Sequence, residues 1–128
     1  LMIGHYTAAA MASENKRLAV PASVDSLPTS GMQEDHVSMA WAATRKLRKV
    51  IDNVRRILAV EYVAAARAID FRAPLMPAKP TGVLLDLLRS EVAGVGPDRY
   101  LSPELQAAEL LLATNAPAEA LEAAGITL

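Results

Sequence analysis

Cysteine is absent from this chain of 128 residues, and aromatic side chains make up only 4% of it. Without cysteine the chain can form no disulfide, zinc–thiolate site or thiol nucleophile of its own. The shortage of aromatic residues, which strands favour, argues against a strand-rich sandwich. Alanine and leucine supply most of the 52% of residues that are apolar, and both favour helices. The composition therefore predicts an all-α fold.

An excess of charge of either sign is also missing. Thirteen basic and 14 acidic side chains give a net charge of −1, whereas a general nucleic-acid binder needs surplus cations to neutralise phosphates. No uncharged run reaches the length of about 20 residues that spans a membrane. Residues 1–13 have an apolar start but lack the basic leading region of a signal sequence. We expect a cytoplasmic protein with no nucleic-acid or membrane partner.

Helical patterns cover most of the chain. Residues 1–18 predict a helix, and residues 19–32, with two prolines and a glycine, predict a long loop. Residues 33–72 contain neither proline nor glycine, which allows one helix about 60 Å long. Residues 73–128 predict shorter helices separated by proline and glycine.

The long predicted helix carries an apolar stripe and a basic run. The basic run, Arg45 to Arg56, could track a phosphate backbone or form a solvated or interface face, and the near-neutral net charge favours the second. Long amphipathic helices seldom stand alone, so a bundle of long helices is expected. The stripe follows the three-four spacing of a buried helical face and contains Leu47, Val50, Ile51, Val54, Ile57 and Leu58.

Four consecutive polar residues lie where the loop is expected to give way to the long helix: Gln33, Glu34, Asp35 and His36. One interpretation is a helix cap, because acids in a first turn complement the helix dipole and Ser30 with Gln33 fits a capping box. The other is a catalytic or binding site, because a cap needs only one or two polar residues. The residues alone leave both interpretations open.

Histidine is scarce, since the chain has only His5 and His36. Neither stands at the His-x-x-x-His or His-Glu spacing that is typical of a metal-binding helix. His36 adjoins two acids, but a helix would splay three consecutive side chains in different directions. The sequence therefore predicts no metal site.

Four motifs occur in order between Tyr6 and Met39. Together they resemble the aromatic amino-acid lyase family and, within it, the histidine ammonia-lyases. The chain would correspond to the C-terminal part of such an enzyme. The motifs are Tyr6-Thr7-Ala8-Ala9, Ser13-Glu14-Asn15-Lys16, Pro21-Ala22-Ser23-Val24-Asp25-Ser26 and Gln33-Glu34-Asp35-His36-Val37-Ser38-Met39.

Two departures from the family pattern lie beside the predicted site. His5 stands where the family more often has Gln before Tyr-Thr-Ala, and Ser30-Gly31-Met32 stands where it often has Ser-Ala-Asn. Both bear on substrate preference.

The resemblance implies a homotetramer whose long central helices bundle together and whose active sites each take residues from three subunits. The reaction it implies is the non-oxidative deamination of L-histidine to trans-urocanate and ammonia. The electrophile would be a methylidene-imidazolone made from Ala-Ser-Gly, a triplet absent from this chain.

The resemblance assigns Glu34 a catalytic role, contacting or deprotonating the imidazole, and Gln33 a role in substrate binding. Asp35 and His36 would support the start of the helix and would hold the substrate-contacting residues in place without touching the substrate. The partners would be the rest of the enzyme chain and identical subunits.

Two alternatives remain. A lyase of the same family could act on another aromatic amino acid, but those relatives tend to carry Asn-Gln-Asp where this chain has Gln33-Glu34-Asp35. Glu34 favours histidine, because a carboxylate can bind or deprotonate an imidazole. A non-catalytic helical-bundle interaction module would explain the long helix but not the loop that leads into Gln33. Without an electrophile, the isolated segment is expected to be inactive.

Overall fold

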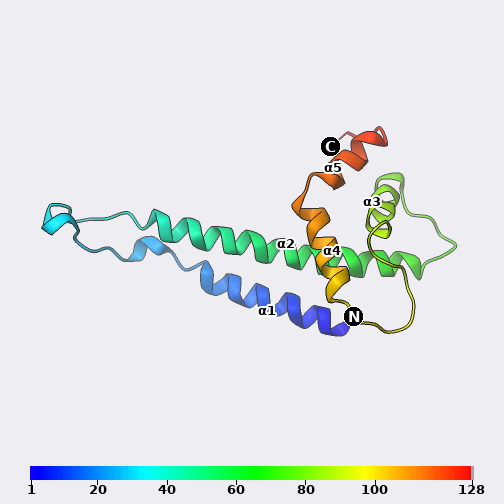
Figure 1. The fold of residues 1–128 in the computed structure, drawn as a ribbon, viewed down its shortest axis with the longest axis horizontal. Helices are drawn as coiled ribbons and strands as arrows, with labels where there is room; N and C mark the ends of the chain where they lie inside the picture. Colours follow the sequence, from blue (N-terminus) through cyan, green and yellow to red (C-terminus); the bar gives the residue numbers. More distant parts are fainter. Residues whose placement is uncertain (128) are drawn as a thin grey trace.

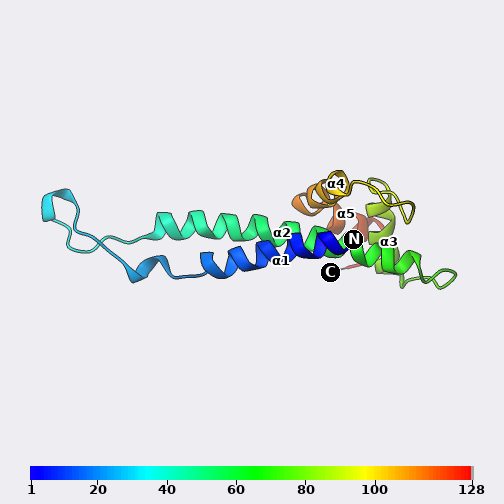
Figure 2. The same cartoon turned by 90° about the horizontal axis from the view of Figure 1, so that it is seen from below.

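A computed structural model describes residues 1–127, which contain five α-helices and no strand. Helices α1 and α2 run side by side in opposite directions, and the other three gather around the C-terminal half of α2 (Figures 1 and 2). The all-α prediction is confirmed. The helices are α1 (Met2–Leu18), α2 (Ala40–Asp70), α3 (Lys79–Arg89), α4 (Ser102–Ala113) and α5 (Ala116–Ala123).

Across residues 1–127, the structure has no helix with the length and apolar character needed to cross a membrane.

A buried polar contact fixes α1 against α2. Asn53 of α2 is only 2% exposed, and its side-chain amide donates to Glu14 Oε2 and to Asn15 Oδ1, each at 2.9 Å. Lys49 Nζ lies 2.7 Å from the other oxygen of Glu14. A buried amide needs its partners, so these bonds define how α1 sits along α2.

Glu14 makes this contact sensitive to pH. Hydrogen bonds from Lys49 and Asn53 hold the pKa of Glu14 below 4.5. Because the pKa is lower in the folded state, the stabilisation is complete above about pH 4.5 and is lost as the pH falls through the folded-state pKa. We expect the thermal unfolding temperature, followed by circular dichroism, to drop in that range. Glu14→Gln removes the stabilisation that depends on the ionised carboxylate. If the unfolding temperatures of the variant and the unchanged chain depended on pH in the same way, this assignment to Glu14 would be contradicted.

The apolar core lies where α2 meets α3 and α4. The Tyr62 hydroxyl donates a hydrogen bond to the carbonyl of Leu84, and Arg89 Nη2 lies 2.6 Å from Asp70 Oδ2. These two bonds attach α3 to the C-terminal half of α2. The buried residues of the core are Ala59, Val63, Ala66, Leu88, Val92 and Ala108.

The long helix begins at Ala40 and ends at Asp70, so the prediction of a helix over residues 33–72 is wrong at its N-terminal end. Residues 33–39 belong to the loop. The capping-box interpretation of Ser30 with Gln33 is wrong too, because only a single 3-10 turn, η2 (Ser30–Met32), occurs there. A second such turn, η1 (Ala22–Val24), lies earlier in the loop.

Competing hydrogen bonds explain the late start of α2. The Ser26 hydroxyl accepts from the Val37 N–H at 2.8 Å and donates to the Val37 carbonyl at 3.1 Å. The backbones of Thr29 and Glu34 also pair in both directions, at 3.0 and 3.4 Å. A helix would need the same groups for its own bonds. The lack of proline and glycine permits a helix there but does not require one.

The apolar stripe of α2 is only partly covered within this chain. Helix α1 packs on the neighbouring row that contains Asn53, Ile57 and Val60. Four members of the predicted stripe are not covered by the other helices of this chain, because periodicity identifies an apolar row but not its partner. These four are Leu47, Ile51, Val54 and Leu58, which are 57%, 48%, 42% and 45% exposed.

Candidate functional site

The loop between α1 and α2, residues 19–39, projects beyond the ends of both helices (Figure 1, cyan; Figure 2). Its tip reverses the chain through three successive residues in the left-handed region. Ser30, Gly31 and Met32 have φ angles of 52°, 62° and 71°. Glycine adopts this region freely, whereas other residues are strained there by about 1–2 kcal/mol each. Strain of this kind is concentrated at functional sites, which draws attention to the residues that follow.

Glu34 lies two residues beyond this left-handed turn, at the bridge that closes the tip, and is exposed. Its backbone pairs with that of Thr29 across the turn. The Thr29 hydroxyl donates to Glu34 Oε2 at 2.7 Å, and within residues 1–127 no hydrogen bond reaches Oε1. One carboxylate oxygen is therefore held while the other is free to meet a group from outside the chain.

The base of the loop is closed by Ser26. Its hydroxyl binds both backbone groups of Val37, 11 positions further along the chain. This contact and the Thr29–Glu34 bridge divide the loop into a closed neck and a closed tip. The tip that carries Glu34 is thus held at two levels, although it projects away from the helices.

The four predicted polar residues do not form one cluster. All are exposed, but His36 lines a hollow of about 380 Å³ at the neck, together with Asp25 and Ser23, whereas Gln33 and Glu34 do not. Asp35 and His36 cannot support the start of α2, which comes later at Ala40, so that prediction is wrong. It stays a prediction that Asp35 and His36 hold the site residues in place. It also stays a prediction that Gln33 contacts the substrate.

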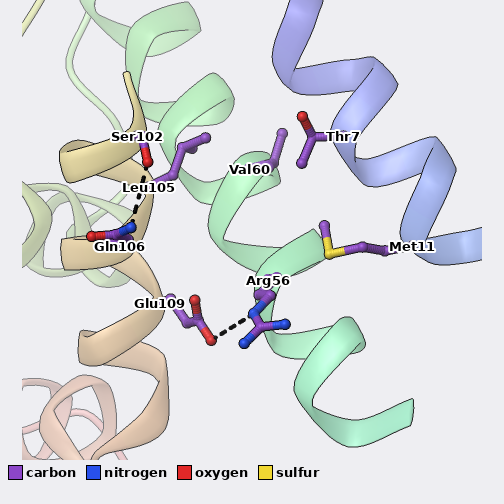
Figure 3. Close-up of a pocket in the computed structure, with 8 residues that line it drawn as sticks. All are labelled: Thr7, Met11, Arg56, Val60, Ser102, Leu105, Gln106 and Glu109. Carbon is purple, nitrogen blue, oxygen red and sulfur yellow. Dashed lines mark hydrogen bonds and ion pairs between the residues drawn. The ribbon is translucent and has the colours of Figure 1, made fainter. Parts of the chain in front are cut away.

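A second hollow, of about 210 Å³, lies between α1, α2 and α4 (Figure 3). Its charged groups are paired with each other, because Arg56 Nε lies 3.1 Å from Glu109 Oε1. Gln106 bonds to Ser102 at 3.4 Å, and much of the remaining lining is apolar. This hollow contains none of the predicted site residues and offers no free charged group for chemistry.

The structure adds Thr29 and Ser26 to the residues that sequence reasoning selected. Ser26 closes one of the family-like motifs, and this is the only signal that marks it. Thr29 and Glu34 flank a short turn that contains Gly31, which is a hairpin signal. The hydrogen bond between their side chains could not be deduced from spacing alone.

Comparison with known proteins assigns this arrangement of helices and loop to an enzyme family. The chain belongs to the aromatic amino acid lyase family, whose model matches residues 1–90. It is 57% identical over 110 residues to histidine ammonia-lyase of Streptomyces avermitilis, covering 85% of this chain. It is 56% identical over 113 residues to histidine ammonia-lyase of Shewanella oneidensis, covering 88% of this chain. The chain spans only 22% of the length of each.

Solved structures give the same fold. A crystal structure of histidine ammonia-lyase from Trypanosoma cruzi superposes with a TM-score of 0.91 at 40% identity, covering 95% of this chain and 24% of that one. Tyrosine aminomutase from Streptomyces globisporus gives a TM-score of 0.87 at 32% identity, covering 96% and 23%. The elongated helical arrangement is therefore shared with relatives whose names indicate different reactions.

Proposed function

We propose that this chain forms one wall of the active site of a histidine ammonia-lyase, which converts L-histidine to trans-urocanate and ammonia. The observation that carries the proposal is the Glu34 carboxylate, exposed on a projecting loop with Oε2 held by Thr29. Its free oxygen can accept a hydrogen bond or a proton from an imidazole. Identities of more than 50% with bacterial histidine ammonia-lyases support histidine as the substrate.

The site needs residues from outside this chain. The methylidene-imidazolone group used by the family supplies an electrophile that prepares the substrate for loss of ammonia. Its precursor, Ala-Ser-Gly, is absent from the 128 residues, so this chain does not itself form that group. Instead, Gln33 and Glu34 present an amide and a carboxylate at the loop tip. These groups fit a role in binding and orienting the substrate.

The exposed row on α2 supports assembly with identical subunits into a homotetramer. Leu47, Ile51, Val54 and Leu58 follow the four-three-four spacing of a coiled-coil seam. All four are more than 40% exposed, and a continuous apolar row of this kind marks an interaction surface. A second copy of α2 offers a matching row. Such packing would bring loops from different subunits together around each site.

A hybrid enzyme tests the proposed function. In it, this chain replaces the segment that it matches in the Streptomyces avermitilis enzyme. We expect the hybrid to form urocanate from L-histidine, and the isolated chain to form none because it lacks the electrophile. The parent enzyme is the control. Urocanate formation by the isolated chain would contradict a shared site, and a hybrid that assembles without turnover would contradict the assigned function.

A further inference from the structure

The proposed function assigns Glu34 to the substrate, and the structure shows what holds Glu34. We propose that Thr29 is a positioning residue, whose hydroxyl fixes Glu34 Oε2 so that Oε1 points to the substrate. This inference rests on the proposed function, because that proposal supplies the substrate, L-histidine. The contact itself is a hydrogen bond of 2.7 Å from Thr29 Oγ1 to Glu34 Oε2.

The backbone places the two side chains together. Thr29 and Glu34 form an antiparallel bridge in which each backbone N–H donates to the other residue's carbonyl, at 3.0 and 3.4 Å. Residues directly opposite in such a bridge have their side chains on the same face and within reach. The left-handed turn at Ser30–Met32 produces this register, so the contact follows from the shape of the tip.

A held carboxylate has a clear advantage on an exposed loop. A free glutamate side chain samples many rotamers, and those rotamers must be lost when the substrate binds. The bond from Thr29 selects one orientation before binding and leaves Oε1 unoccupied. Because the acceptor is charged, the hydrogen bond is also stronger than one between neutral groups.

Thr29→Val in the hybrid enzyme tests this role, since valine keeps the shape of threonine and removes the donor. We expect kcat/KM for L-histidine to fall about 10–100-fold, the size expected for loss of a hydrogen bond to a charged group. The loss should appear in the same parameter, kcat or KM, that Glu34→Gln changes. Thr29→Ser should retain most of the activity.

Thr114→Val is the matched control. Thr114 is exposed at the C-terminal end of α4, and its hydroxyl donates to the Leu111 carbonyl at 2.9 Å, so the same chemical change is made away from Glu34. We expect unchanged kinetics. In a Glu34→Gln background, Thr29→Val should cause little further loss, because the carboxylate that it positions is gone. A full additional loss in that background, or equal damage from Thr29→Ser, would overturn the proposal.

Crystal structures of the hybrid and its Thr29→Val variant keep this test separate from the proposed function. We expect Glu34 to be ordered on Thr29 in the first and turned away or disordered in the second. An unchanged Glu34 orientation in the variant overturns the inference whatever the rates are. An active hybrid in which Glu34→Gln is damaging but Thr29→Val is harmless overturns only the inference. An inactive hybrid in which Glu34 still depends on Thr29 overturns only the proposed function.

Discussion

Glu34→Gln in the hybrid enzyme is expected to lower kcat/KM for L-histidine by at least about 100-fold. The substitution keeps the size of the side chain and its place at the loop tip, but it removes the negative charge. An amide cannot take a proton from the substrate, and loss of a general base costs about 10²–10⁴-fold in rate. Steady-state rates of urocanate formation measure the effect.

The same kinetics distinguish two roles for Glu34. If the carboxylate only binds the imidazole, the loss lies mainly in KM, whereas the loss of a base lies mainly in kcat. Glu122→Gln is the matched control, because Glu122 is exposed on α5, far from the loop along the chain. An unchanged rate for Glu34→Gln, with the electrophile formed and the assembly intact, would remove Glu34 from the mechanism.

Leu58→Asp is expected to break the assembly of the hybrid enzyme and abolish its activity at the same time. Leu58 lies within the exposed four-three-four row of α2, and burying an unpaired carboxylate between helices costs several kcal/mol at each site. The cost recurs in every copy of the subunit. Light scattering coupled to gel filtration would show smaller species. Activity would be lost with them, since the proposed assembly brings loops from several subunits to each site.

Ala42→Asp provides the control for this prediction. Ala42 is exposed near the start of α2, and its direction is turned by roughly 140° from that of Leu47, the nearest member of the row. An acid in a first helical turn is also compatible with the helix dipole. We expect this variant to assemble normally. A tetramer of full size and full activity with Leu58→Asp would show that the row is not the subunit interface.

The sequence predicts the helices well because their signals are local. The alanine- and leucine-rich composition indicates the all-α fold, and the loop after α1 follows from its prolines and glycine. The start of α2 is different. It depends on the Ser26 hydroxyl binding Val37 across 11 positions, and a contact between distant residues leaves no periodic pattern.

Burial on α2 was harder to predict than the helix itself. Asn53 belongs to a strongly basic run, yet it is almost fully buried between α1 and α2. Leu47 and Leu58 belong to the apolar stripe, yet they are exposed in this chain. Several rows of one long helix can each be an interface, and periodicity does not tell which partner covers which row.

The candidate site was predicted in part. Gln33 and Glu34 stood out as part of a polar cluster. Their roles came from the resemblance and stay predictions. The contact of Thr29 with Glu34 could not be predicted, because it depends on three successive left-handed residues at the tip. Serine and methionine rarely adopt that conformation, so a sequence gives little reason to expect it.

The most direct test of the central claim is a crystal structure of the hybrid enzyme with urocanate bound. The deciding quantity is the distance from Glu34 Oε1 to the nearest imidazole nitrogen. We expect a hydrogen-bond distance of about 2.7–3.2 Å, with Oε2 still held by Thr29. A ring that is bound by other groups, with the Glu34 carboxylate out of reach, would contradict the claim.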